Sequence, residues 1–214
     1  MQIDRLVLGS YENNSYIVRR DEETEDCIII DTGLTAKPLI AFLKKKNLNP
    51  HALILTHGHA DHIAGATLLR KNFDKIKICI HKADLHMLGD AASNLSSSAG
   101  VKIITAPADV LFDKEEQIEF ANLSFRLIHT PGHTPGSICL YKSDEKILFS
   151  GDTLFAGSIG RIDFSGYDVQ KCLEQLVNNI KSKLLVLPDD TTILPGHGEE
   201  TTIKQEKLHN PYLH

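Results

Sequence analysis

The feature of this sequence that most constrains its fold is a dense cluster of histidines between an apolar run, 52–55, and a helix-like run, 63–69. The cluster has the order H-x-H-x-D-H and consists of His57, His59, Asp61 and His62. Imidazole nitrogens and carboxylate oxygens are ligands that suit zinc, iron or manganese, and the alternating spacing lets neighbouring side chains face two adjacent metal positions. We therefore expect half of a dinuclear metal site, held on a strand-to-helix turn by rigid elements on both sides.

The second half of such a site must come from distant parts of the chain, and three candidate residues follow in order. They are His133 in T-P-G-H-T, Asp152 in S-G-D-T and His197 in P-G-H-G. Each follows an apolar, strand-like stretch, and these stretches are 124–128, 146–149 and 191–194. Glycine and proline beside each candidate indicate tight turns. We expect each of these strands to deliver one ligand from its carboxyl end.

Length and composition favour one soluble enzyme domain spanning residues 1–214. The net charge of −5 and the single basic cluster, 44–46, argue against a nucleic acid partner. The short apolar runs and the N-terminal residues predict neither a membrane span nor an export signal. The widely spaced cysteines favour neither a disulfide framework nor a thiolate metal site; they are Cys27, Cys79, Cys139 and Cys172. We expect a cytoplasmic protein.

Other residues that could carry chemistry are interpreted more simply. The remaining histidines are expected to be surface or satisfied core residues: His51, His81, His86, His129, His209 and His214. Asp31, in the run D-T-G, is interpreted as a turn-forming side chain that bonds local backbone amides. Arg161 either pairs with Asp163 or reaches substrate, and the ion pair is slightly favoured.

Strand-like and helix-like segments alternate along the chain without a linker. Apolar residues recur at helical spacing over 169–180 and, after Pro38, over 39–43. Strands are expected at 16–18, 27–30, 52–55, 77–80 and 137–140. Periodicity alone supports only an α/β class. The small, polar stretch 91–100 is expected to be a mobile surface loop that borders the active-site mouth.

Taken together, these motifs resemble the metallo-β-lactamase fold superfamily over nearly the whole chain. The runs 13–16, 31–33 and above all 151–164 (G-D-T-L-F-A-G-S-I-G-R-I-D-F) look like its glyoxalase II, or hydroxyacylglutathione hydrolase, branch, especially the short bacterial members. The resemblance implies that one metal is held by His57, His59 and His133. It implies that the other is held by Asp61, His62 and His197, with Asp152 bridging both.

The resemblance also implies a four-layer αββα sandwich and two divalent metal ions, with zinc expected and iron or manganese as alternatives. Only residues 198–214 follow His197, enough for a helix over 202–208 that Thr202 and Gln205 begin as a capping box. The chain is therefore expected to be without the C-terminal helical domain with which full-length glyoxalase II enzymes contact glutathione. Glutathione contacts cannot be transferred from the family to this sequence.

The chemistry expected of such a site is hydrolysis of a small-molecule thioester, such as S-lactoylglutathione, to a carboxylic acid and a thiol. A metal-bridging hydroxide is the nucleophile, and a thiolate leaves without a general acid because its pKa is only about 8.5. Asp61 and Asp152 are the expected catalytic carboxylates, and Arg161 is a candidate substrate contact. The nearest alternative is a mononuclear iron persulfide dioxygenase. Lactonase or β-lactamase activity and a non-catalytic metal-binding module rank lower, and the oligomeric state stays open.

Overall fold

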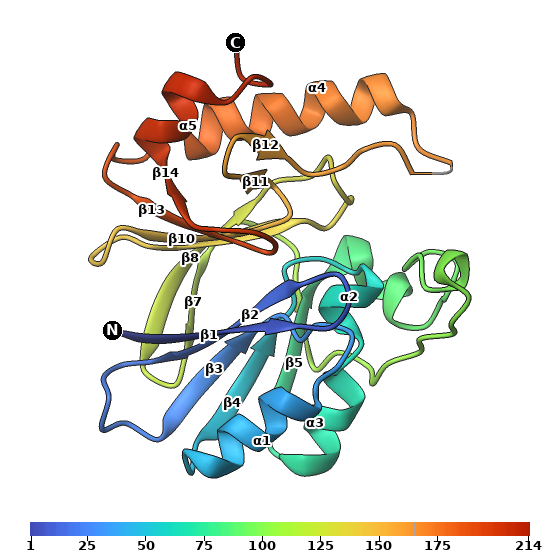
Figure 1. Cartoon of the computed structure of the whole chain (residues 1–214), viewed down its shortest axis with the longest axis vertical. Coiled ribbons are helices and arrows are strands. Elements are labelled where there is room, and N and C mark those ends of the chain that lie inside the picture. The colour runs from blue at the N-terminus through green and yellow to red at the C-terminus, as the bar shows by residue number, and fades with distance from the viewer. Residues whose placement is uncertain (165) are drawn as a thin grey trace.

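The computed structural model describes residues 1–164 and 166–214, which form two mixed β-sheets packed face to face (Figure 1). Strands of the first sheet neighbour one another in chain order. The sheet contains β1 (Gln2–Leu8), β2 (Asn13–Arg19), β3 (Asp26–Ile30), β4 (Asn49–Ile54), β5 (Lys77–His81) and β6 (Val110–Phe112). The pairs from β1 to β3 are antiparallel and those from β3 to β6 are parallel.

The second sheet brings three strand ends to one edge. Its strands, in spatial order, are β14 (Thr201–Thr202), β13 (Thr192–Pro195), β10 (Ile147–Gly151), β9 (Ile138–Lys142), β8 (Leu123–His129) and β7 (Gln117–Phe120). Strand β10 is parallel to β13 and antiparallel to β9, which is itself antiparallel to β8. Strands β8, β10 and β13 therefore run in the same direction, and their carboxyl ends lie on the same side of the sheet. The hairpin of β11 (Leu154–Phe155) and β12 (Ser158–Ile159) follows β10.

Helices cover the outer face of each sheet. Figure 1 shows α1 and α3 on the first sheet, and α4 and α5 on the second. The helical segments are α1 (Lys37–Lys45), α2 (Ala60–Ile63), α3 (Ala66–Asn72), η1 (Lys82–Leu88), η2 (Ser97–Ala99), α4 (Val169–Asn179), η3 (Ile180–Leu184) and α5 (Ile203–His209). Within the described part of the chain, one apolar core lies under each helical layer and another between the sheets. The predicted four-layer αββα sandwich is confirmed.

Local sequence explains where these helices begin. Pro38 lies in the first turn of α1, whose buried face consists of Leu39, Ile40 and Leu43. Asp168 caps α4 by accepting a hydrogen bond from the Lys171 amide. Thr202 caps α5 in the same way with the Gln205 amide, as the sequence predicted for the C-terminal segment. Among the described residues, no helix is both long and apolar enough to cross a bilayer.

The segment 91–100 differs from the simple surface loop expected of its composition. Asn94 is fully buried, and its side-chain amide donates to the carbonyls of Met87 and Ile103. The backbone carbonyl of Asn94 accepts from the backbone amide of Ala60, the first residue of α2. The segment thus serves as a cap for the helix that begins inside the H-x-H-x-D-H run, because the first amides of a helix lack partners within it.

The core between the sheets contains large aromatic side chains that set the distance from one sheet to the other. Tyr16 of β2 contacts Phe149 of β10 edge to face, with ring centroids 5.3 Å apart, and Phe125 of β8 lies 6.2 Å from Phe149. All three are almost completely buried. The rings therefore act as spacers between the two sheets whose strand ends carry the candidate ligands.

We predict that Phe149→Ala lowers the free energy of unfolding by about 3 to 5 kcal/mol, because it leaves a cavity between the sheets. Urea denaturation followed by circular dichroism measures the change. Val186→Ala is the matched control, since that apolar side chain is 68% exposed. A loss from Phe149→Ala no larger than that from Val186→Ala would contradict the spacer interpretation.

Candidate metal centre

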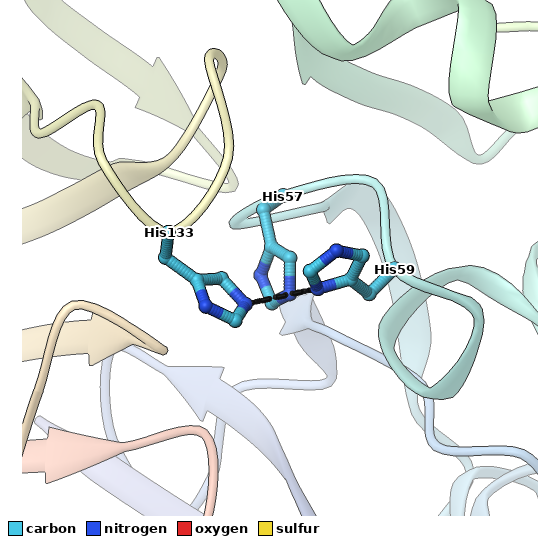
Figure 2. Close-up of side chains that lie close together, drawn as sticks. All are labelled: His57, His59 and His133. Atoms are coloured by element: carbon cyan, nitrogen blue, oxygen red, sulfur yellow. Dashed lines mark hydrogen bonds between the residues drawn. The ribbon is translucent and has the colours of Figure 1, made fainter. Parts of the chain in front are cut away.

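Three histidines from two sheets bring their ring nitrogens together at one point. His57 and His59 follow β4, and His133 follows β8. Figure 2 shows the three rings pointing toward one another. The His57 Nε2 atom lies 3.1 Å from His59 Nδ1 and 3.2 Å from His133 Nε2, and the latter two atoms are 2.9 Å apart. The ring nitrogens of the three histidines that the family resemblance assigned to the first metal therefore converge.

These short separations are better explained by a shared cation than by hydrogen bonds among the imidazoles. A closed triangle of nitrogens cannot satisfy each contact, because a neutral imidazole has one donor nitrogen and one acceptor nitrogen. Zinc held tetrahedrally at 2.0 to 2.1 Å implies nitrogens about 3.3 Å apart. The triangle of His57, His59 and His133 has nearly this size, so the residues fit a transition-metal ion.

The second group lies beside the first and contains Asp61, His62 and His197. The Nε2 atom of His197 lies 3.1 Å from Asp61 Oδ2 and 3.2 Å from His62 Nε2. Asp61 and His62 belong to α2, whereas His197 follows β13. This group again joins the two sheets.

Asp152, the first residue after β10, lies between the two groups. Its Oδ2 atom is 3.6 Å from Nε2 of both His133 and His197, and its Oδ1 atom is 3.4 Å from Nε2 of His62. Among the described residues, Oδ1 is a buried oxygen without a hydrogen-bond partner. A buried carboxylate oxygen without such a partner is costly unless a cation compensates it, so this atom also fits a metal.

The two groups differ in their electrostatic surroundings. Burial lowers the pKa of His57, His59 and His133, so these imidazoles stay neutral and able to coordinate a metal. Burial also acts on His62, but Asp152, Asp31 and Asp61 outweigh it and raise the pKa of His62 well above its ordinary value. Carboxylates therefore concentrate negative charge around the second group, where a cation would take the place of a proton.

Comparison with known proteins decides the family. Residues 8–197 match the metallo-beta-lactamase superfamily. The chain belongs to this superfamily. It is 36% identical to the "Hydroxyacylglutathione hydrolase GloC" of Haemophilus influenzae over 215 residues, which cover all of this chain and 98% of that protein.

Two solved structures share the architecture over almost the whole chain. A crystal structure of the BLEG-1 B3 metallo-beta-lactamase is 41% identical, with a TM-score of 0.91 and 99% of both chains covered. A crystal structure of TTHA1623 in a di-iron-bound form is 33% identical, with a TM-score of 0.81, and the match covers 98% of this chain and all of that one. The predicted superfamily is thus confirmed.

In this superfamily member, backbone carbonyls orient two of the inward-facing histidines. The Nδ1 atom of His133 donates to the carbonyl of Arg161 over 2.8 Å, and Nδ1 of His197 donates to that of Tyr11 over 2.9 Å. A carbonyl can only accept, so the proton of each neutral ring lies on Nδ1 and the lone pair of Nε2 faces the centre. Such outer partners commonly fix the orientation of metal-binding imidazoles.

Asp31 has different partners from the local amides expected of it. Its Oδ1 atom accepts from the Thr56 amide over 2.8 Å. Its Oδ2 atom accepts from the Thr56 hydroxyl over 2.7 Å and lies 2.8 Å from His62 Nδ1. The predicted structural role holds, but the turn interpretation was wrong, because the partners lie more than twenty residues away in sequence. Asp31 orients His62, and its sequence position after an apolar strand gave no sign of that partner.

The remaining histidines lie outside both groups. His129 stacks on His81, with ring centroids 4.0 Å apart, and donates to the carbonyl of Pro135. His81 is not the satisfied core residue expected: among described residues its Nε2 has no partner. Arg161 forms the expected ion pair with Asp163, with Nε 2.9 Å from Oδ1, and both side chains are mostly exposed.

We predict that His133→Ala lowers the metal content by about one ion per chain, because it removes one of three ligands from the first group. His129→Ala, four residues earlier, should retain the parental content. Elemental analysis after saturation with zinc and removal of excess metal measures both. Equal metal content in the two variants would show that the converging histidines do not bind an ion.

Proposed function

We propose that this protein is a metal-dependent hydrolase of thioesters, which converts S-lactoylglutathione or a related acyl thioester to a carboxylic acid and a thiol. The observation that carries hydrolysis is the position of Asp152, whose carboxylate faces both candidate ligand groups. The proposed ligands are His57, His59 and His133 for one ion, and Asp61, His62 and His197 for the other. Asp152 is proposed to bridge the two.

Two divalent ions, when bound, supply a water activated near neutral pH and an electrophile for the carbonyl oxygen. Zinc is the proposed metal because it suits a mixed set of imidazole and carboxylate ligands. Iron is the main alternative, since the similar protein TTHA1623 is described in a di-iron-bound form. Manganese also suits such ligands.

The chain's own carboxylates set the geometry of the reaction. Asp61 lies at the rim of the centre, with its side chain 17% exposed and its Oδ2 atom 3.1 Å from His197 Nε2. It is placed to accept a hydrogen bond from the attacking water and so to orient it. Asp152 is more deeply placed, and its two oxygens set the separation of the ligand groups.

The site is better suited to a thioester than to an amide-like substrate, because the two leaving groups differ in their need for a proton. Each carboxylate and imidazole of the two groups is assigned as a ligand, so none of them serves as a proton donor. A thiolate departs unprotonated because its pKa is about 8.5, whereas an amine must be protonated as it leaves. Thioester cleavage thus makes the smallest demand on this site.

Similarity to GloC supports the same choice of substrate. The aligned region covers 98% of that protein, so the activity in its name belongs to a chain without a large additional C-terminal domain. A hydroxyacylglutathione substrate therefore does not require glutathione contacts from such a domain.

Phe164 and Arg161 are proposed to contact the substrate beside the first group. The Phe164 ring lies 4.8 Å from the ring of His59 and 5.4 Å from that of His133. The guanidinium of Arg161 lies 5.2 Å from the Phe164 centroid, within the range of a cation–π contact. An exposed cation that contacts Phe164, the ring beside His59 and His133, favours a substrate with a carboxylate, which glutathione has.

A second candidate function is hydrolysis of β-lactams, because the BLEG-1 protein, at 41% identity, is described as a B3 metallo-beta-lactamase. A third candidate is the persulfide dioxygenase reaction, because a crystal structure of ETHE1 from Myxococcus xanthus is 26% identical over 99% of this chain, with a TM-score of 0.78. The three reactions differ in products and in their need for oxygen, so one set of assays separates them.

We predict that the zinc-loaded protein releases thiol from S-lactoylglutathione without oxygen uptake and opens a chromogenic cephalosporin at least about 100-fold less efficiently, a difference of about 2.7 kcal/mol in transition-state stabilisation. Protein purified without air and loaded with zinc or with ferrous iron is given the thioester, the cephalosporin or glutathione persulfide. Thiol, absorbance and oxygen are followed together. Iron-dependent oxygen uptake with no thioester cleavage under either metal would refute the proposal, and preferential cephalosporin cleavage would favour the second candidate.

We predict that Asp61→Asn lowers kcat for the best thioester about 100-fold, because it weakens the second ligand group and the orientation of the attacking water. His51→Ala is the control, since His51 is exposed and pairs with Asp26 away from the centre. Steady-state kinetics at saturating metal compares both with the parent. Parental kcat in Asp61→Asn would remove the role assigned to this carboxylate.

A further inference from the structure

Asp84 is a buried carboxylate that lies outside both ligand groups yet touches the loops that carry them. It belongs to η1, directly after β5 of the first sheet, and its side chain is completely buried. Its Oδ2 atom accepts from the amide of Gly58, which lies between His57 and His59, over 2.9 Å. This contact holds the backbone of the H-x-H-x-D-H run.

The same carboxylate also binds the loop that follows β8 of the second sheet. Oδ2 accepts from the Thr134 hydroxyl over 2.6 Å, and Oδ1 accepts from the Gly136 amide over 2.6 Å. Thr134 is the neighbour of His133 in sequence. The Ser137 hydroxyl lies 2.8 Å from that of Thr134 and accepts from the Thr134 amide, which orders the turn further.

The glycines of both loops are explained by the close approach of η1. A Cβ atom on Gly136 would lie 2.6 Å from Cγ of Asp84, and one on Gly58 would lie 2.6 Å from Cβ of Met87. Real Cβ atoms do not approach this closely, so side chains at either position would push η1 away from the loops. Both ligand loops therefore have glycine where the carboxylate and its helix must approach them.

We propose that Asp84 is a positioning residue for the group of His57, His59 and His133. Its carboxylate connects the ligand loop of one sheet to that of the other and holds the three imidazoles at the separation that one metal ion requires. This inference rests on the proposed metal centre and extends it to a residue outside the ligand set. The Asp84 carboxylate acts only as a hydrogen-bond acceptor.

The chemistry of the three donors explains why aspartate, and not asparagine, is needed. Two backbone amides and one hydroxyl converge on two oxygens, and an ionised carboxylate offers only acceptors. In Asp84→Asn one oxygen becomes an NH₂ group that faces a donor, so at least one contact is lost without a change of side-chain volume. Loss of an outer partner of this kind typically lowers metal affinity about 10- to 100-fold.

The test measures zinc affinity in two backgrounds that separate the ligand groups. His197→Ala leaves the group of His57, His59 and His133 complete, whereas His133→Ala leaves only the group of Asp61, His62 and His197 complete. Adding Asp84→Asn should lower zinc affinity about 10- to 100-fold in the first background and leave it nearly unchanged in the second. Competition with a chromogenic chelator gives the affinities. The visible absorption of the cobalt-substituted protein reports the coordination geometry, which should change only in the first background.

A matched control and a conservative pair guard against a general loss of stability. Asp109→Asn changes a carboxylate that also binds backbone at β5, through the Ile78 amide, but away from the ligand loops. Its zinc affinity should equal the parental one. Thr134→Val removes the hydroxyl donor to Asp84 and should weaken zinc binding in the His197→Ala background. Thr134→Ser keeps the donor and should restore it.

The proposal is overturned if folded Asp84→Asn keeps the parental zinc affinity and cobalt spectrum, whatever its free energy of unfolding. Asp84 would then be a structural residue. If Asp84→Asn does not fold, the threonine pair decides, and equal affinities of Thr134→Val and Thr134→Ser overturn it. No zinc binding by His197→Ala alone would remove the metal centre on which the inference rests. Because these affinities are measured without substrate, a failed thioester assay contradicts the proposed function and not the role of Asp84.

Discussion

The packing of one sheet on the other is the constraint on which the centre depends. Each ligand group takes residues from both sheets, and the nitrogens of the first group lie only 2.9 to 3.2 Å apart. Strand β4 points its carboxyl end at this place from one sheet, and β8, β10 and β13 do so from the other. Because protein interiors are close-packed, the aromatic side chains between the sheets determine the distance from one sheet to the other. A change in their volume would therefore change the positions of the ligands.

Hydrogen bonds to backbone carbonyls and to a buried carboxylate then orient three of the histidines within that frame. Carbonyls of loop residues orient His133 and His197, while the Asp31 carboxylate orients His62. Asp84 acts on the loops themselves, through amides and a hydroxyl. The ligands are thus fixed by partners from several segments, and their convergence does not depend on contacts among the ligands alone.

The C-terminal helix has a place in the same frame. Glu206 of α5 is buried and accepts from the Gly157 amide over 3.0 Å, and the Asn210 side-chain amide donates to the Ser158 carbonyl over 3.0 Å. Both contacts hold the β11–β12 hairpin that follows Asp152. Lys207 pairs with Asp189, and Tyr212 is half exposed. The contacts of the C-terminal helix thus support the hairpin that follows the candidate ligand Asp152.

The sequence by itself determined the ligand types, their order along the chain and the strands that precede them, because periodicity and turn residues are local properties. His57, His59 and His133 could be chosen as ligand candidates from their motifs, and the family resemblance then placed them in one group. The helices at Lys37–Lys45 and Val169–Asn179 could be predicted from their apolar faces. Tertiary structure alone decided the partners of Asp31 and Asp84, the burial of Asn94 and the different positions of His129 and His133. These partners and positions depend on which atoms of distant segments come into contact when the sheets pack. A local sequence pattern contains no information about such contacts.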